Sequence, residues 1–322
     1  MNEQVALNAA DAPQLANPAA RVIDPILTTA ARGYMNPALV FRALFPVVTT
    51  GARGGTRIEF DRTDFRKVNT RRAPGATTQH VQFGHEGKKF ALTQHRLMGK
   101  VPVETAEEAM TVAGIDLGMR TVTGVQNIIG LEREIHAAEL VLAAATYDAT
   151  HVNTLAGNAQ WSNGASTPTR NVMAAVETIR AATGMRPNTV IMGGQVYSQV
   201  RVHEDVLQQI RYAGGRQIAN KEDLARLWDV ERVVVGDAIY VDEDDTPKDV
   251  WGKDVVIAYT AVGSISRYEP SFGYGYNLSG TPMVEQAYYD RDKNSWLYPV
   301  TEEWTNEVVG KDAGYLIKNA IA

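Results

Sequence analysis

The spacing of hydrophobic positions changes along the chain and predicts a different structure for each stretch. Within residues 51–100 polar and apolar side chains alternate, as in Thr56–Asp61 and Val81–Phe83, which predicts β-strands. From about Gly114 to Ala145 apolar residues recur mainly every three or four positions, which predicts a long helix. Three glycines inside this stretch each weaken helix formation by about 1 kcal/mol. We therefore expect the helix to lie along a sheet or a neighbouring element that supports it.

The second half of the chain carries clear signals for where helices begin and end. Thr167 and Pro168 open a helix with regularly spaced apolar positions, and Gly184 ends it. Asn220 is the expected cap of a later helix. Further helices are predicted over 195–201, 205–212 and 221–228, and strands over 189–192, 232–241, 255–259, 284–290, 296–309 and 315–321. Because helix-rich and strand-rich stretches are segregated along the chain, the sequence predicts an α+β fold.

The N-terminal region differs from the rest in composition. Residues 1–20 are rich in Ala, Asn and Pro, which predicts an extended arm. The next stretch is apolar but interrupted by prolines, and we expect a short helix over Pro37–Leu44 with Asn36 as its cap. Farther along, Arg71–Gly75 has the composition of a turn, so residues 51–100 are expected to form one long two-stranded projection. Because an isolated hairpin is marginal in water, we expect the projection to lie on another surface.

Composition excludes several classes of protein. With 44% hydrophobic and 21% charged residues, the 322-residue chain is ordinary for a globular protein and too apolar for disorder. Its apolar stretches are far shorter than the roughly 20 residues of a membrane span, and Met1–Gln4 does not begin a secretory signal. Because the chain has no cysteine, disulfides, thiolate metal sites and cysteine nucleophiles are excluded. These features predict a soluble protein of a cytosol-like compartment, with no membrane partner.

Charge is distributed unevenly along the chain. Residues 51–100 hold eleven Lys or Arg and four acids, so their net charge is +7 and that of the remainder is −12. Residues 104–150 hold eight acids and two arginines, a net charge of −6, and residues 285–322 have a net charge of −3. Such segregation indicates a partner, which is either nucleic acid or an acidic protein surface.

Candidate chemical sites are few. Asp242–Asp245 offers oxygen ligands for a divalent cation, but it lacks the glycine of a calcium loop, and we favour a solvated loop. The six histidines are scattered and lack metal-site spacing. Gly273–Gly275 lacks the correctly spaced third glycine of a dinucleotide loop, and we expect it to form a loop at a tight subunit junction. We therefore predict no catalytic, cofactor-binding or metal-binding residues, and a protein that is not an enzyme.

Several motifs in the second half occur in the order found in one protein family. Pro187–Gly193 resembles the entry strand of that family, and His203–Tyr212 resembles its helix of the type HPDVLDRIKY. Trp228–Ala238 resembles its strand of the type GVERVLVGDA. Three further stretches are also similar: Trp251–Asp254, Pro270–Tyr274 and Ala313–Ile317. In this ordered set the chain resembles the major capsid proteins of tailed bacteriophages, whose fold is named after the phage Hong Kong 97.

The resemblance implies an order of parts along the chain. The expected parts are an N-terminal arm (1–50), an extended β-hairpin loop (51–100), a peripheral domain with a spine helix (101–186), an inserted axial α/β domain (187–282) and a return to the peripheral-domain sheet (283–322). About 50 residues precede the hairpin loop, which is too few for a fused scaffold.

The function implied by the resemblance is structural. The expected protein self-assembles into hexamers and pentamers of an icosahedral shell around double-stranded DNA, in a virion assembled in the host cytoplasm. The expected partners are copies of itself, a separate scaffolding protein, a portal and, as a candidate, a decoration protein. An encapsulin-like nanocompartment shell shares the fold and is one alternative. A nucleic-acid-binding protein that uses residues 51–100 is the other, because Lys and Arg neutralise phosphates.

Charge also indicates how copies would meet. The positive projection is complementary to the negative helix and tail, and we favour their contact between adjacent copies over contact with nucleic acid. The predicted contacts join Arg57, Arg62, Arg66, Lys67, Arg71 and Arg72 of one subunit to Glu132, Glu134, Glu139, Glu302 and Glu303 of a neighbouring subunit. Each exposed pair contributes about 0–1 kcal/mol, so such a contact depends on many repeated pairs.

Overall fold

The computed structural model describes most of the chain, and the predicted N-terminal arm and most of the predicted projection lie outside the described residues. The described residues are 23–34, 36–58, 71, 87–111, 116–212, 218–261 and 269–322. Two compact units make up the chain: a first unit of Met1–Tyr34, Arg96–Val125 and Pro282–Thr301, and a second unit of Met35–His95, Gln126–Thr281 and Glu302–Ala322. Among the helices of the described residues, none is long and apolar enough to cross a membrane.

The first unit combines short helices with strands that pair along one long strand. Its elements are α1 (Pro25–Gly33), α2 (Val103–Thr111), β12 (Met283–Val284) and β13 (Tyr288–Asp290), with parts of β4 (Thr93–Pro102), α3 (Leu117–Leu142) and β14 (Ser295–Val308) that continue into the second unit. Asp24 begins α1, because its carboxylate accepts hydrogen bonds from two backbone N–H groups of the first turn. The Thr28 hydroxyl exchanges two hydrogen bonds with the backbone of Val284, which fixes α1 on β12.

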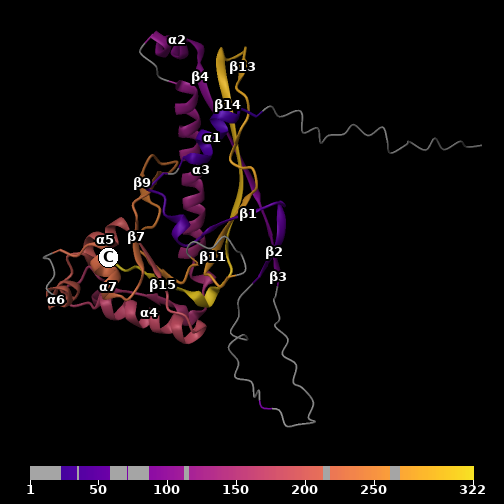
Figure 1. Cartoon of the computed structure of the whole chain (residues 1–322). Helices are drawn as coiled ribbons and strands as arrows, with labels where there is room; N and C mark the ends of the chain where they lie inside the picture. Colours follow the sequence, from indigo (N-terminus) through magenta and orange to yellow (C-terminus); the bar gives the residue numbers. More distant parts are fainter. Residues whose placement is uncertain are drawn as a thin grey trace, which may run out of the picture. The chain divides into compact units, whose positions relative to one another are not determined.

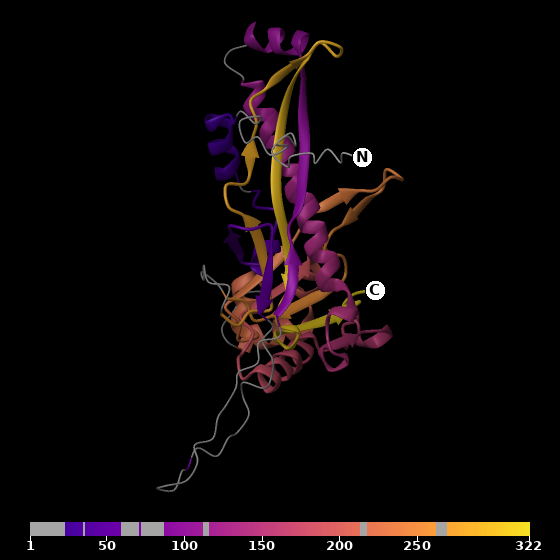
Figure 2. The same cartoon turned by 90° about the vertical axis from the view of Figure 1, so that its right-hand side faces the viewer.

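The strand β14 is the centre of a six-stranded sheet. It pairs antiparallel with β13 and β12 in the first unit and with β11 (Gly273–Leu278) in the second. It also pairs with β4, and β1 (Val47–Thr50) joins the sheet parallel to β11. Figure 2 shows β14 as the long yellow strand, with β4 in purple and α3 beside it.

The long helix α3 corresponds to the predicted helix, and its glycines show what supports it. A Cβ on Gly118 would lie 2.9 Å from the ring of Tyr298, and a Cβ on Gly130 would lie 2.8 Å from Cδ1 of Leu39. At two of the three glycines the missing side chain leaves room for a side chain of a neighbouring segment. The packing of that side chain on the helix offsets the weak helix propensity of the glycine. The expectation that the helix packs along supporting elements is confirmed at these positions.

The second unit is built on a five-stranded sheet. Its strand order is β5 (Val152–Thr154), β15 (Gly314–Lys318), β10 (Val255–Ala258), β6 (Thr189–Gly193) and β7 (Arg232–Gly236). The helices around it are α4 (Pro168–Thr183), α5 (Gly194–Val200), α6 (Glu204–Tyr212) and α7 (Lys221–Leu227), as Figure 1 shows. Short 3₁₀ turns are η2 (Phe41–Ala43), η4 (Ala144–Thr146), η5 (Ala149–His151), η6 (Gly157–Ala159) and η7 (Lys311–Ala313).

The helices of this unit begin and end where the local signals predict. Pro168 opens α4, and Gly184 ends it in a left-handed conformation with φ of 71°. Asn220 and Asp223 form a capping box at the start of α7. The apolar face of α4 is buried with the fully buried strand β6 in one hydrophobic core, which also holds Trp161 and Trp228.

Two hairpins leave the second unit. The first pairs β2 (Gly54–Ile58) with β3 (Gly87–Ala91) and is the described base of the predicted projection. The second pairs β8 (Ile239–Val241) with β9 (Pro247–Asp249) and carries the acidic run Asp242–Asp245 at its turn, where Lys248 pairs with Asp242. Figure 2 shows the second hairpin in orange.

Several local predictions were wrong. Residues 37–38 form a turn, closed by the Asn36 side chain, which accepts from the N–H of Ala38, and within Pro37–Leu44 only Phe41–Ala43 is helical. Gly273–Gly275 is part of the buried strand β11 rather than a loop, and the missing side chain of Gly273 leaves room for the ring of Phe45. The predicted strand 232–241 is divided into β7 and β8.

The C-terminal strand also differs from expectation. β15 pairs with β10 and β5 in the five-stranded sheet, and not with the sheet of β14 to which residues 283–322 were expected to return. Its residues are almost entirely buried, which explains the continuous apolar run of this segment. The five-part division of the chain remains a prediction in its other boundaries.

Candidate intersubunit site

The base of the basic projection is held on β14 by an arginine fork. Nε and Nη2 of Arg53 donate to the two carboxylate oxygens of Glu303 at 2.7 and 2.9 Å. Gln94 adds a third donor to the same carboxylate at 3.1 Å. Glu303 is only 3% exposed, so these donors satisfy a carboxylate that has little access to water.

A second arginine of the projection is paired in the same way. Arg57, on β2, forms an ion pair with Glu307 of β14. On the neighbouring strand, the ring of Phe90 is buried and stacks on Tyr276 at 4.2 Å between centroids. The base of the projection therefore has both apolar and ionic contacts within its own chain.

Next to this base, α3 presents a buried arginine. The guanidinium of Arg133 lies over the rings of Phe41 and Trp304, at 4.6 and 5.1 Å from their centroids. Its Nε donates to Asn306 at 3.3 Å, and Nη1 lies 3.8 Å from Glu302. Burial lowers the pKa of Arg133 to about 10, and burial raises the pKa of Glu302 although Arg133 opposes that shift.

Two histidines complete this cluster. The ring of His95 stacks on Trp304 at 4.0 Å with an interplanar angle of 4°, and its Nδ1 lies 3.3 Å from Glu132. His136 meets the same indole edge-on at 5.7 Å, and burial lowers the pKa of its imidazole. Trp304 is thus surrounded by one arginine and two imidazoles where β4, β14 and α3 meet.

Glu134 forms the other buried contact of α3. Its carboxylate accepts from the backbone N–H groups of Val40 and Phe41 at 3.0 and 2.8 Å and from Nε1 of Trp251 at 2.6 Å. The residue has no exposed surface, and burial raises the pKa of its carboxyl. The three donors are the physical reason why an acid is tolerated at this position.

The predicted contact residues differ in their exposure and in their partners within the chain. Among the acids, Glu134, Glu302 and Glu303 have partners inside their own chain. Glu132 and Glu139 are exposed on α3, and Glu132 also lies 3.3 Å from His95. Among the basic residues, Arg57 pairs with Glu307 and Arg71 is exposed. Arg62, Arg66, Lys67 and Arg72 lie outside the described residues. Contact of either set with a neighbouring subunit remains a prediction.

The residues that hold the base of the projection were not predicted from the sequence. Arg53 and Glu303 are 250 positions apart, as are Arg57 and Glu307. Neither separation gives a local signal. In a strand residues four positions apart lie on the same face, and this spacing is the one sequence relation that groups Glu303 with Glu307.

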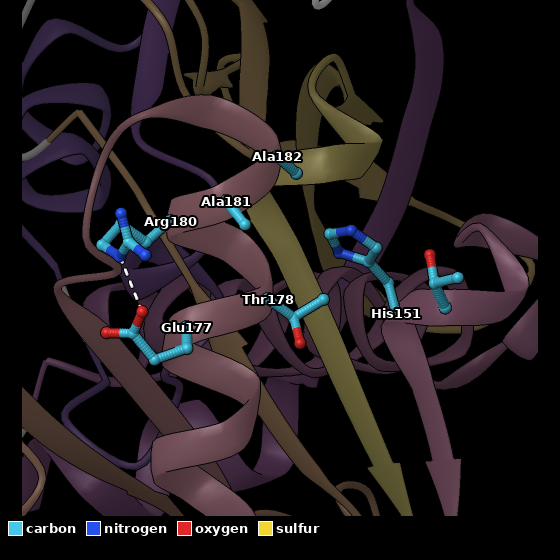
Figure 3. A pocket seen from close by; sticks show the side chains of 7 residues that line it. His151, Glu177, Thr178, Arg180, Ala181 and Ala182 are labelled. Carbon is cyan, nitrogen blue, oxygen red and sulfur yellow. Dashed lines mark hydrogen bonds and ion pairs between the residues drawn. The ribbon is translucent and has the colours of Figure 1, made fainter.

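A pocket of about 490 Å³ lies between η5 and α4 (Figure 3). Glu177 and Arg180 on its rim bond to each other at 2.7 Å. His151 is buried, and its Nδ1 bonds to the carbonyl oxygen of Gly314, while the Thr178 hydroxyl donates to the carbonyl of Ala174. The polar lining residues thus contact neighbouring protein groups, and none forms a nucleophile–base pair with another. Within the described part of the chain, no group of three His, Asp or Glu is placed to hold a metal ion.

Comparisons with known proteins agree on one family. The model of the family described as phage major capsid protein E matches residues 67–302. The chain is 30% identical over 302 residues to a major capsid protein of Burkholderia phage BcepMu, covering 92% of this chain and 96% of that protein.

Solved structures give the same fold. A crystal structure of a phage-related protein from Bordetella bronchiseptica RB50 is 39% identical, with a TM-score of 0.80 over 93% of this chain and 98% of that one. The capsid structure of Cyanophage P-SCSP1u has a TM-score of 0.56 at 11% identity, over 89% of both chains. The α+β fold is that of phage capsids, as the sequence motifs predicted. The chain belongs to the phage major capsid protein E family, and it is a structural protein of the virion that assembles with its own copies into a shell.

Proposed function

We propose that this chain tiles as hexamers and pentamers into an icosahedral head that encloses double-stranded DNA. The family match over residues 67–302 is the observation that carries this proposal. An arm (1–50), a hairpin loop (51–100), a peripheral domain with the spine helix (101–186) and an axial domain (187–282) are proposed with it. Assembly in the host cytoplasm with a separate scaffolding protein, a portal and a decoration protein belongs to the same proposal.

The proposed contact between copies is made by the basic projection. At its base, Arg53 and Arg57 already pair with acids of their own chain, which supports a contact made farther along the segment. The other basic residues proposed for this contact are Arg62, Arg66, Lys67, Arg71 and Arg72. Its net charge of +7 against −6 for residues 104–150 supports docking on an adjacent copy.

Burial favours two acids as the receiving surface. Glu134 and Glu303 are interior and bonded, and Glu302 lies beside Arg133. Glu132 and Glu139 are exposed on the helix α3, where a neighbouring projection has access to them. The proposed docking contact therefore centres on these two residues.

Electron microscopy of the purified protein in negative stain tests the assembly. We expect the purified protein to form closed shells or capsomers. Closed shells recovered from infected cells are expected to contain DNA. Shells filled with a cargo protein and free of DNA would support the encapsulin-like alternative. A monomer that binds nucleic acid in a salt-dependent manner and never assembles would support the nucleic-acid-binding alternative.

Charge reversal tests the docking contact. We expect Arg62→Glu, Arg66→Glu and Arg71→Glu together to block shell closure while the subunit stays folded. Arg170→Glu with Arg226→Glu, which reverses exposed arginines on α4 and α7, is the control and is expected to leave assembly intact. Normal shells from the triple variant would refute docking through the projection.

A further inference from the structure

The turn between η6 and α4 holds the one Asn-Gly pair of the sequence, Asn163-Gly164. The N–H of Asn163 donates to the carbonyl oxygen of Gln160 at 2.9 Å. Gly164 is exposed, and a Cβ at this position would meet nothing within 4 Å among the described residues. Gly164 has no side chain to shield its nitrogen, which follows the Asn163 side chain directly along the chain and can close a succinimide ring with it.

The surroundings of the turn activate the Gly164 nitrogen. The carbonyl oxygen of Asn163 belongs to the same peptide group as this nitrogen, and it accepts from the N–H of Ser166 at 3.0 Å. Nε2 of the buried His203 lies 3.0 Å from the same oxygen and 3.0 Å from the Ser166 hydroxyl. Because Nδ1 of His203 accepts from the N–H of Asp205, the ring proton is on Nε2. Donors on this carbonyl stabilise the anion that forms when Gly164 loses its amide proton.

The side-chain amide of Asn163 is polarised by a backbone donor of the same turn. Its Oδ1 accepts from the N–H of Ala165 at 2.9 Å. When the Gly164 nitrogen adds to Cγ, negative charge develops on Oδ1, where this N–H group stabilises it. The leaving nitrogen, Nδ2, donates to Oδ1 of Asn158 at 3.0 Å in an exposed contact, so water has access to protonate it. The turn therefore activates both the attacking nitrogen and the carbon that it attacks.

We infer that Asn163 and Gly164 form a self-modifying site, at which Asn163 is converted to isoaspartate and aspartate without an enzyme. Hydroxide removes the Gly164 amide proton, and the nitrogen forms a bond to Cγ of Asn163. The bond from Cγ to Nδ2 breaks, and ammonia leaves with a proton from water. Water then opens the succinimide: attack at the main-chain carbonyl gives isoaspartate, and attack at the side-chain carbonyl gives aspartate. Water is the one co-reactant that the reaction requires.

The modification would change how the turn holds residues 319–322. The N–H of Trp161 donates to the carbonyl oxygen of Ala320 at 2.6 Å, and the N–H of Ala322 donates to the Ser162 hydroxyl at 3.1 Å. Isoaspartate lengthens the main chain of the turn by a methylene group, and either product adds a negative charge at neutral pH. We therefore expect residues 319–322 to be held less firmly in modified copies. The reaction takes place within one subunit, so the inference goes beyond the proposed function and does not depend on assembly.

Peptide mapping of the full-length protein by mass spectrometry tests the site. Folded protein is incubated in water enriched in oxygen-18, which marks conversion that occurs during the incubation, and the same protein in urea is the unfolded reference. We expect Asn163 to convert about fivefold faster or more in the folded protein than in urea, with isoaspartate among the products. The exposed Asn158, which precedes Ala159, is the internal comparison and is expected to convert about tenfold more slowly than Asn163.

Gly164→Ala tests the attacking nitrogen. The added methyl group crowds this nitrogen, and the open space around the position leaves the fold unchanged. We expect the conversion of Asn163 to become about tenfold slower in this variant. The rate in the wild type is also expected to rise with pH, because Gly164 must first lose its amide proton.

Two variants of His203 test its role as a positioning residue. His203→Phe keeps a ring but removes the donor to the Asn163 carbonyl, and it is expected to slow the conversion by about fivefold. His203→Gln keeps an N–H donor, and it is expected to recover part of the wild-type rate. Circular dichroism establishes that each variant is folded, which a merely slower rate would not show.

Several results would overturn the inference. One is an Asn163 that stays unmodified, or that converts no faster in the folded protein than in urea. Another is aspartate without isoaspartate, which would indicate direct hydrolysis of the amide with no succinimide. Equal rates in the wild type and in folded His203→Phe would show that the contact of His203 with the turn does not activate it.

Discussion

The indole Nε1–H of Trp251 donates a hydrogen bond of 2.6 Å to Oε1 of Glu134. Glu134 belongs to α3, and Trp251 lies between β9 and β10. The same carboxylate accepts from the backbone of Val40 and Phe41, which precede β1. One buried acid thus joins three parts of the second unit that are far apart in sequence, and all of its donors are N–H groups.

Replacing this acid is expected to destabilise the subunit. In Glu134→Gln one carboxylate oxygen becomes an NH₂ group, which donates hydrogen bonds and cannot accept them. In place of Oε1 this group faces the N–H groups of Val40 and Trp251, and in place of Oε2 it faces the N–H of Phe41. A buried donor left unsatisfied costs about 1–3 kcal/mol. We expect a loss of this size in the free energy of unfolding, measured in urea. The exposed Glu139→Gln on the same helix is the control and is expected to change it by less than about 0.5 kcal/mol.

Stability is also expected to depend on pH through one buried carboxyl, Glu134, and one partly buried carboxyl, Glu302. Burial raises the pKa of Glu134 and of Glu302 in the folded chain above the ordinary value of 4.5. At a pH between the pKa of such a carboxyl in the unfolded chain and its raised pKa in the folded chain, the folded chain binds more protons than the unfolded chain. Their contribution to stability is therefore complete below pH 4.5 and is lost as the pH rises through the raised folded pKa.

The measurement is urea unfolding of wild type and Glu302→Gln between pH 4 and 7. The free-energy difference between wild type and variant is expected to fall as the pH rises, because only the wild type carries the titrating Glu302 carboxyl. A difference that is constant over this range would show that this carboxyl titrates alike in both states.

The sequence predicted those parts of the fold whose signals are local. Pro168 and Gly184 mark the ends of α4. The ring of proline fixes its own φ, and glycine adopts the left-handed conformation of a helix end, so both signals depend on one residue alone. The strand β11 was missed, because the packing of Gly273 against Phe45 joins residues more than 220 positions apart. The motifs in the second half of the chain predicted the family, because they occur in the order found in that family although each motif is short.

The candidate contact residues were less predictable, for a physical reason. Charge counting treats every acid of α3 and β14 as available to a partner. The structure shows that Glu303 and Glu307 pair with Arg53 and Arg57 of the same chain. Glu134, on α3, is buried against Trp251. Which acids remain exposed depends on the tertiary fold, and no local pattern contains that information.

Two glycine substitutions are expected to have opposite effects. A Cβ on Gly236 of β7 would lie 2.0 Å from Cδ1 of the buried Trp251, so Gly236→Ala forces the indole from its place. We expect a loss of about 1–3 kcal/mol or more in the free energy of unfolding. A Cβ on Gly124 of α3 would meet nothing within 4 Å, so Gly124→Ala is expected to add about 1 kcal/mol through helix propensity. Thermal unfolding of both variants checks the pair, and equal shifts would contradict this account of the Trp251 contact.

Arg133 and Glu302 are expected to depend on each other. Arg133→Met removes the guanidinium that lies 3.8 Å from Glu302 and leaves that partly buried carboxylate without this charge partner. We expect a loss of about 3–5 kcal/mol in the free energy of unfolding, the usual cost of breaking a buried ion pair from one side. Adding Glu302→Gln to this variant removes the uncompensated charge, so the double variant is expected to be more stable than Arg133→Met alone by about 1 kcal/mol or more. Urea unfolding of the wild type, the two single variants and the double variant gives the coupling energy. Additive losses would mean that Arg133 stabilises the subunit through its stacking on Phe41 and Trp304 and its hydrogen bond to Asn306, and not through Glu302.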